Sequence, residues 1–336
     1  MKQKELFKLL DGIQEKGKGT VQSERILMID GLNLFFRNFA VMNMVNPDGV
    51  HIGGLGGFFR SLGAMIRQTK PTQVYVVFDG AGSANNRKNI NPLYKSGRDL
   101  QRITNWDAFD DKQDEDDSKV DQMVRVIQYL KTLPVKTISI DKVEADDIIS
   151  YLSSVVVNKP EDKVFIVSSD KDFIQLVNDR ISVWSPTKKK LYTPEVVREE
   201  FQVPSHNFVM YRVIDGDKSD NVPGIKGFGL KTLIKKVPKI LEDNKITTDD
   251  LIAEGFDTDI INRNYDLMQL DDVNISGKAK LEIQHSVDEN DTQLIKYEFQ
   301  KMMIEDKCVA TFMNLDSWLA ETFNKLNIIA RNHYDR

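Results

Sequence analysis

The sequence has few of the residues that build disulfides and zinc sites. Among its 336 residues are one cysteine, Cys308, and four histidines. A single cysteine cannot close an internal disulfide or form a thiolate metal site, and this usage is typical of proteins in a reducing cytosol. We therefore expect a cytoplasmic protein without a disulfide scaffold or a His-rich zinc site.

Long apolar runs and net positive charge are missing as well. No window approaches the roughly 18 apolar residues of a membrane span, and residues 1–24 have no apolar core of the kind found in secretion signals. Lys and Arg total 46 against 51 for Asp and Glu, so the net charge of −5 excludes binding of a polyanion through net charge. Local basic patches are not excluded.

Two parts of the chain carry different patterns. From residue 25 to 192, short β-branched runs alternate with helical patterns, which predicts an α/β domain with a mainly parallel sheet. The expected strands are 26–30, 74–79, 135–140, 163–170 and 181–186. Residues 193–336 predict a helical domain, which opens where Thr193 caps a helix before Pro194. Residues 1–24 are expected to be an amphipathic extension.

Acidic residues recur where the expected strands end. Asp30, Asp79 and Asp170 each close an apolar run. Because the carboxyl ends of parallel strands meet at one edge of a sheet, these acids should line one crevice. Further acids lie nearby in the pattern: Glu144, Asp146, Asp147, Asp172, Asp217 and Asp220. Any one of them is more often a turn or cap residue, but together they would repel one another unless cations were bound.

The chemistry of this expected cluster favours hard cations. Carboxylate oxygens suit Mg²⁺ or Mn²⁺ better than zinc. Two such ions about 4 Å apart are a common device for phosphodiester hydrolysis, because they generate a hydroxide and stabilise the leaving oxygen. The acidic pattern therefore predicts a two-metal phosphodiesterase.

Five motifs, in their order along the chain, resemble the flap endonuclease and 5′→3′ exonuclease superfamily. They are LMIDGLNLFFR, VVFDG, VEADD, SSDKDF and GDKSDNVPGIKGFGLKT, and the match spans roughly 25–240. Within the superfamily, VWSPTKKK and the segment around NWD are similar to the ribonuclease H enzymes of T-even-type bacteriophages. The resemblance implies a PIN-like domain with a helical arch at about 85–119, then a helix–three-turn–helix motif at about 206–237.

Metal ligands also follow from the resemblance. It implies a first site formed by Asp30, Asp79, Asp146 and Asp170, with Glu144 acting directly or through water. It implies a second site formed by Asp172, Asp217 and Asp220. Asp147 matches a position that is acidic only in some branches of the family.

Basic residues follow the second expected strand. Arg87, Lys88, Lys95, Arg98 and Arg102 lie within 16 residues. Such a run alone is usually a solvated face. The resemblance places it on the arch, with Lys95 and Arg98 facing the scissile phosphate as catalytic groups and with Arg87 and Lys88 steering the strand. The acidic run 107–117 that follows is expected to be a solvated, disordered loop.

A second basic segment, 224–239, contains no acid. Gly227 and Gly229 allow a tight turn into a helix whose free N–H groups suit a phosphate. A nucleotide-binding loop is the competing interpretation, but the segment lacks P-loop spacing. The resemblance makes it a clamp on duplex backbone that can hold K⁺, with DNA-binding residues Lys226, Gly227, Gly229, Lys231, Thr232 and Lys235. Phe36 is either a core residue or an aromatic platform for a base.

The resemblance implies an Mg²⁺-dependent 5′→3′ exonuclease and flap endonuclease, with Mn²⁺ able to substitute. Its expected substrates are RNA–DNA hybrids and duplex DNA with 5′ ends or flaps, and its role is RNA primer removal in DNA replication. The resemblance also implies a single-strand-binding protein and a sliding clamp as partners. We expect the protein to be a monomer and to be encoded by a phage. Two alternatives stay open: a PIN-type single-strand ribonuclease and a non-catalytic protein that binds DNA junctions.

Overall fold

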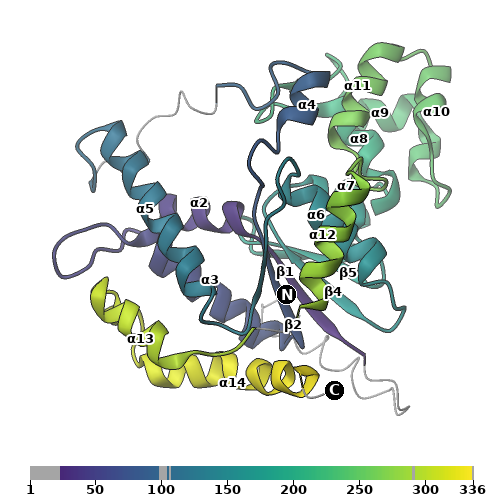
Figure 1. Ribbon diagram of the computed structural model, residues 1–336. Helices are drawn as coiled ribbons and strands as arrows, with labels where there is room; N and C mark the ends of the chain where they lie inside the picture. Colours follow the sequence, from purple (N-terminus) through teal and green to yellow (C-terminus); the bar gives the residue numbers. More distant parts are fainter. Residues whose placement is uncertain (1–22, 98–103, 106, 290–291, 335–336) are drawn as a thin grey trace.

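A six-stranded sheet forms the centre of the computed structural model, which describes residues 23–334 except 98–103, 106 and 290–291 (Figure 1). The strand order is β3-β2-β1-β4-β5-β6. The strands are β1 (Arg25–Asp30), β2 (Gln73–Val77), β3 (Lys136–Ile138), β4 (Lys163–Val167), β5 (Ile181–Ser185) and β6 (Lys190–Tyr192). The first five pair in parallel, which confirms the expected α/β architecture. The antiparallel β6 was not expected, because three residues leave too little pattern.

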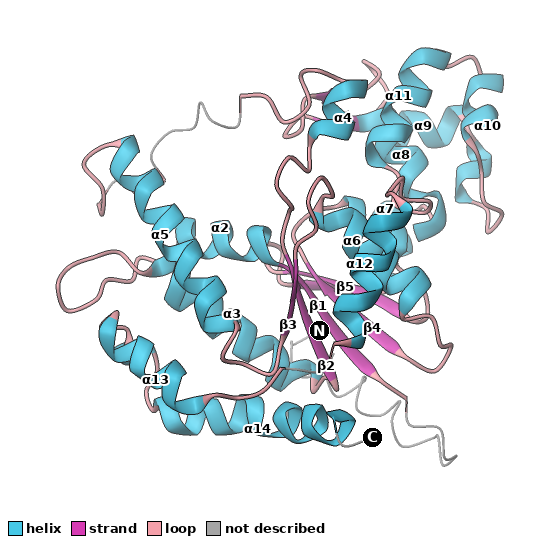
Figure 2. Cartoon of the chain, viewed as in Figure 1, coloured by secondary structure: helices cyan, strands magenta, loops and turns pink. Residues whose placement is uncertain are grey.

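Helices cover both faces of the sheet, so the central strands are buried on both sides (Figure 2). In β1, Leu27 and Ile29 belong to one core, whereas Ile26 and Met28 belong to the other. The first face carries α2 (Gly31–Val41), α3 (Gly53–Thr69) and α5 (Lys112–Leu130). The second face carries α6 (Ala145–Tyr151), the π-helical turn η2 (Leu152–Val156) and α7 (Pro194–Phe201).

The arch region is more ordered than expected. Helix α4 (Asn85–Ile90) follows β2, and α5 already begins at Lys112, within the acidic run. Asp111 caps α5 by accepting the N–H of Asp114 at 2.9 Å, and the buried Glu115 accepts the N–H of Thr104 at 2.8 Å. The expectation of a disordered loop was wrong for these residues, because acids in the first turn of a helix are stabilised by its dipole.

A smaller helical part has a core of its own. It consists of the 3-10 turns η4 (Ser205–Asn207) and η5 (Pro238–Leu241), the short strands β7 (Gly216–Asp217) and β8 (Val222–Pro223), and the helices α8 (Phe208–Asp215), α9 (Leu230–Lys236), α10 (Thr248–Ala253) and α11 (Thr258–Met268). Val213, Leu233 and Ile261 lie in this core. The capping of α7 by Thr193 before Pro194 is confirmed.

The expected single helical domain over 193–336 is wrong. Helix α12 (Gly277–Asp288) packs on the second face of the sheet through Ile283. Helices α13 (Lys296–Glu305) and α14 (Leu315–Tyr334), joined by the 3-10 turn η6 (Val309–Thr311), lie along α3 (Figure 1). Phe299 of α13 meets Phe59 of α3 with ring centroids 5.6 Å apart. An amphipathic pattern shows that a helix has an apolar face, but not which core that face joins. Among the described residues, no helix has the length and apolar composition that crossing a bilayer requires.

Candidate active site

The acids predicted at the strand ends lie at the carboxyl edge of the sheet. Asp30 ends β1 and caps α2, because its Oδ1 accepts the N–H of Asn33 at 3.0 Å. Its Oδ2 accepts the Ser168 hydroxyl at 3.0 Å, which ties β1 to the end of β4. Asp79, just beyond β2, accepts the N–H of Ala145 at 2.7 Å and so fixes the start of α6. Burial, together with the nearby charges of Asp79 and Asp146, raises the pKa of Asp30 to about 6.

Three acids at the start of α6 form a compact group, called here the first acidic group. Glu144, Asp146 and Asp147 each offer an oxygen, and these oxygens lie within 4.8 Å of one another. Glu144 is buried and the other two are partly exposed. Burial and the charge of Asp146 together raise the pKa of Asp147 to about 7. An all-oxygen set of this kind fits a hard divalent cation.

Arg87 of α4 lies inside the first acidic group. Its Nη2 is 2.9 Å from Asp147 Oδ1 and 3.2 Å from Asp146 Oδ2, and its Nη1 pairs with Glu144. Burial favours the neutral guanidine, yet these carboxylates raise the pKa of Arg87 well above its ordinary value. Arg87 is only 7% exposed, so it is not the surface residue that strand steering was expected to need. Sequence spacing placed it on the arch but could not show that its side chain turns inward.

The segment after α4 also contacts the first acidic group. Lys95 pairs with Glu144 through its Nζ, and the hydroxyl of the buried Tyr94 donates to Glu144 Oε2 at 3.3 Å. The backbone N–H of Lys95 donates to the carbonyl of Asp220 at 3.0 Å. The stem of the arch, residues 85–95, therefore contacts both the first acidic group and the GDKSDN turn. Lys88 is exposed, whereas Arg98 and Arg102 lie outside the described residues.

Asp172 and Asp217 meet around a second buried arginine. Arg212 of α8 donates from Nε to Asp172 Oδ1 at 2.8 Å, from Nη1 to the Gly216 carbonyl at 3.0 Å, and from Nη2 to Asp217 Oδ2. Asp217 Oδ1 also accepts the N–H of Ser219 at 2.7 Å. Asp170 accepts the N–H of Asp172 at 2.8 Å, and burial, followed by the charge of Asp172, raises the pKa of Asp170. Asp172, Asp217 and Asp220 are called here the second acidic group.

Sequence reasoning missed Tyr94, Ser168 and Arg212. Of these, Arg212 had a readable signal, because it is a charged residue within the apolar helical stretch FVMYRVI. A charge on the buried face of a helix requires an internal partner. Asp217 follows five residues later and was itself among the predicted ligands.

The basic turn of the helical part is exposed. Lys226, Gly227 and Gly229 lie in the turn before α9, and Lys231, Thr232 and Lys235 lie on that helix. Gly227 has φ +85 with open space around it, as expected for a glycine in a tight turn. Phe36 is 48% exposed and meets Phe35 edge to face at 5.5 Å, so the core alternative for it was wrong.

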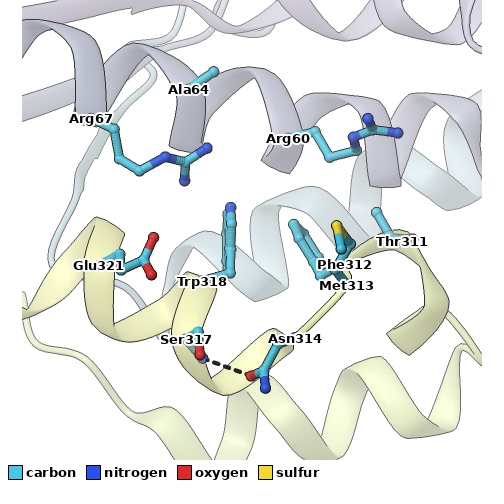
Figure 3. A pocket seen from close by; sticks show the side chains of 10 residues that line it. All are labelled: Arg60, Ala64, Arg67, Thr311, Phe312, Met313, Asn314, Ser317, Trp318 and Glu321. Atoms are coloured by element: carbon cyan, nitrogen blue, oxygen red, sulfur yellow. Dashed lines mark hydrogen bonds between the residues drawn. The ribbon is translucent and has the colours of Figure 1, made fainter.

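A pocket of about 550 Å³ lies between α3 and the start of α14 (Figure 3). Arg60, Ala64 and Arg67 line it from α3, and Phe312 and Trp318 line it from the opposite side. None of the predicted site residues lies in its wall.

Comparison with known proteins agrees with the fold and the motifs. The family described as "5'-3' exonuclease, N-terminal resolvase-like domain" matches residues 25–202, more than half of the chain. The 5′-3′ exonuclease of Aquifex aeolicus is 32% identical over 215 residues, which cover 64% of this chain and 69% of that protein. DNA polymerase I of Bacillus subtilis is 31% identical over 66% of this chain, but the match spans only 24% of the polymerase.

A solved structure shows the same fold. The bacteriophage T5 flap endonuclease, in a complex with DNA and metal ions, superposes with a TM-score of 0.60 over 84% of this chain and 99% of the phage chain, at 21% identity. This likeness concerns the fold, whereas the family match rests on sequence. The chain belongs to the 5′-3′ exonuclease family and is a nuclease.

Proposed function

We propose that the protein is a divalent-metal-dependent 5′→3′ exonuclease and flap endonuclease. It acts on duplex DNA with 5′ ends or flaps and on RNA–DNA hybrids, and it removes RNA primers during DNA replication. One observation carries the proposal: acids from both parts of the chain meet at the carboxyl edge of the sheet, beside an arch stem that carries Lys95.

The oxygen donors fit two hard cations such as Mg²⁺, with Mn²⁺ as a substitute. The first would be held by Asp30, Asp79, Glu144, Asp146 and Asp170, with Asp147 alongside, and the second by Asp172, Asp217 and Asp220. When bound, such ions supply a hydroxide and stabilise the leaving oxygen of a phosphodiester.

Other side chains bind and orient the substrate. Lys95 and Arg98 are proposed to face the scissile phosphate and to stabilise its developing charge. Exposed Lys88 steers the strand, and Phe36 stacks on a base beside the cleft. Arg87 reaches a phosphate only after leaving the first acidic group.

The turn before α9 grips the duplex. Lys226, Lys231 and Lys235 are exposed, and none of them takes part in an ion pair among the described residues. They would bind backbone phosphates without reading sequence, which predicts strong salt dependence. Carbonyls of the same turn are proposed to hold K⁺ between protein and phosphate. We also propose that the protein is a monomer and that a single-strand-binding protein and a sliding clamp dock onto it.

The test is a product analysis on three matched 5′-labelled substrates: flap DNA, RNA–DNA hybrid and single-stranded RNA. We expect short 5′-phosphorylated products from the flap and the hybrid with Mg²⁺, and none with a chelator. Cleavage of the free RNA alone would move the assignment to a PIN-type ribonuclease. Tight flap binding without products in Mg²⁺ would leave a junction-binding protein.

A further inference from the structure

We propose that Arg212 is a positioning residue that builds the second acidic group by holding Asp172 and Asp217 together. This inference rests on the proposed nuclease function, in which those two acids hold a cation. The carboxylates come from different parts of the chain. Asp172 opens the 3-10 turn η3 (Asp172–Leu176) behind β4, whereas Asp217 lies in β7, beyond α8.

The guanidinium binds each partner through a different nitrogen. Nε donates to Asp172, Nη2 to Asp217 and Nη1 to the carbonyl of Gly216, the residue directly before Asp217. A lysine could not reproduce this arrangement, because its ammonium is a single point charge, whereas the arginine fork is planar and rigid. The geometry of Arg212 therefore specifies where both carboxylates lie relative to each other.

Arg212 leaves part of each carboxylate for another ligand. It uses Oδ1 of Asp172 and Oδ2 of Asp217, and the other oxygen of Asp217 is oriented by Ser219. Arg212 is a buried residue of α8 and is only 3% exposed. Its side chain therefore stays in place while the outer surface of the second acidic group meets solvent or substrate. Without it, two carboxylates on separate segments would repel each other and move apart.

This role differs from a contribution to stability alone. A buried ion pair often adds little net stability compared with apolar side chains, because removing two charges from water is costly. Asp172 and Asp217 nevertheless bind the same guanidinium, which also connects the sheet part to the helical part. We infer that the second cation site is complete only while α8 is docked on η3.

The test measures Mn²⁺ binding by calorimetry on the full-length protein without nucleic acid. We compare wild type, Arg212→Gln, Arg212→Lys and the control Arg125→Gln. Arg125, on α5, also forms a partly buried ion pair, with Asp306 at 2.8 Å. This pair lies outside both acidic groups.

We expect two Mn²⁺ binding events in wild type. Arg212→Gln should weaken one of them at least about tenfold, as is typical when a group that orients a metal ligand is lost. Arg212→Lys should restore only part of the affinity, and Arg125→Gln should lower the melting temperature without changing Mn²⁺ binding. With flap DNA, Arg212→Gln should lower kcat and leave KM unchanged.

Two unchanged binding events in folded Arg212→Gln would overturn the inference. If Arg212→Gln does not fold by circular dichroism, Arg212→Lys decides, because wild-type Mn²⁺ affinity there would also overturn it. In an Asp217→Asn background, adding Arg212→Gln should cost little further affinity, and a full additive loss contradicts the role. Wild type that binds two Mn²⁺ ions but cuts no flap would refute the proposed function alone, and the binding data would still decide the role of Arg212.

Discussion

The two acidic groups differ in where their arginine comes from. Arg212 lies on α8, five residues before one of its own partners, and cannot leave without displacing that helix. Arg87 lies on the six-residue helix α4, and the chain between it and its partners at 144–147 includes the rest of the arch. Arg212 is thus built into its site by a single helix, whereas Arg87 reaches its partners from the arch stem, where its Nε also donates to the carbonyl of Leu267 at 3.0 Å.

This difference implies opposite effects on cation binding. Arg212 organises carboxylates whose positions the fold would otherwise leave loose. Arg87 binds Glu144, Asp146 and Asp147, and so occupies the oxygens that a divalent cation needs. Tyr94 and Lys95 contact Glu144 as well, so the arch stem as a whole competes for the first acidic group.

The largest effect should come from removing a ligand of the first acidic group. Asp146→Asn keeps the shape of the side chain but removes its negative charge, and we expect cleavage of a 5′ flap to fall more than about 100-fold. Binding of the flap in a filter assay should persist, because the basic turn before α9 is unchanged.

The matched control is Asp243→Asn, since Asp243 is 88% exposed and its one ion pair within the described part of the chain is with Arg198 at the surface. Turnover at the wild-type rate in Asp146→Asn would remove this residue from the metal site. Equal losses in both variants would point to a general loss of structure.

Much of the gathering of acids at the carboxyl edge of the sheet could be predicted from sequence, because it follows from topology. Asp30, Asp79 and Asp170 end strands that were readable as apolar runs, and parallel strands bring those ends together. The partners of Arg87 could not be predicted in advance. Arg87 and Asp147 are 60 residues apart, and only the folded path of α4 makes them neighbours.

The packing of α13 and α14 against the first face of the sheet could not be predicted from sequence either. Phe299 and Trp318 could have packed on any apolar surface of the molecule, and their helical spacing is the same in each case. Long-range packing of this kind depends on the shapes of both surfaces, which a single sequence does not display.

The second prediction tests the comparison directly. Replacing Arg87 by Gln removes the internal cation, so we expect the Mn²⁺ affinity of the first acidic group to rise by about tenfold, as Coulomb repulsion at an effective dielectric constant of about 20 allows. Calorimetry on the free protein measures it, beside Lys88→Gln, an exposed neighbour on the same helix, as the control. If Arg87→Gln weakened Mn²⁺ binding as Arg212→Gln is expected to, the two arginines would share one role and the comparison would fail.

The third prediction separates grip on the duplex from organisation of the metal ligands. Lys231→Ala combined with Lys235→Ala should weaken flap binding and reduce the slope of log K against log salt by about 1.8, since each lost phosphate contact removes about 0.9. Mn²⁺ binding should not change. Lys278→Ala, which removes an exposed lysine from α12, should leave the slope as it is. An unchanged slope in the double variant would place the duplex clamp elsewhere.

The smallest effect concerns the stability of the metal-free protein. The pKa of Asp147 is raised to about 7 and that of Asp30 to about 6, both above the ordinary value of 3.8. The folded protein therefore binds more protons than the unfolded chain in this range, so its free energy of unfolding should fall as pH rises. From about pH 6.5 to about pH 8 we expect a loss of about 1 kcal/mol, most of it from Asp147.

Denaturant melts in chelator measure this loss, and Asp147→Asn should flatten the pH profile because the titrating group is gone. Asp250→Asn is the control, since the pKa of Asp250 is lowered to about 2 and it stays ionised throughout this range. A stability that rose with pH in wild type would contradict the raised pKa values. Saturating Mn²⁺ should abolish this dependence of stability on pH, because cation binding favours the ionised carboxylates. The Mn²⁺ concentration required should be lower in Arg87→Gln than in wild type, since that variant no longer carries a competing cation among the same oxygens.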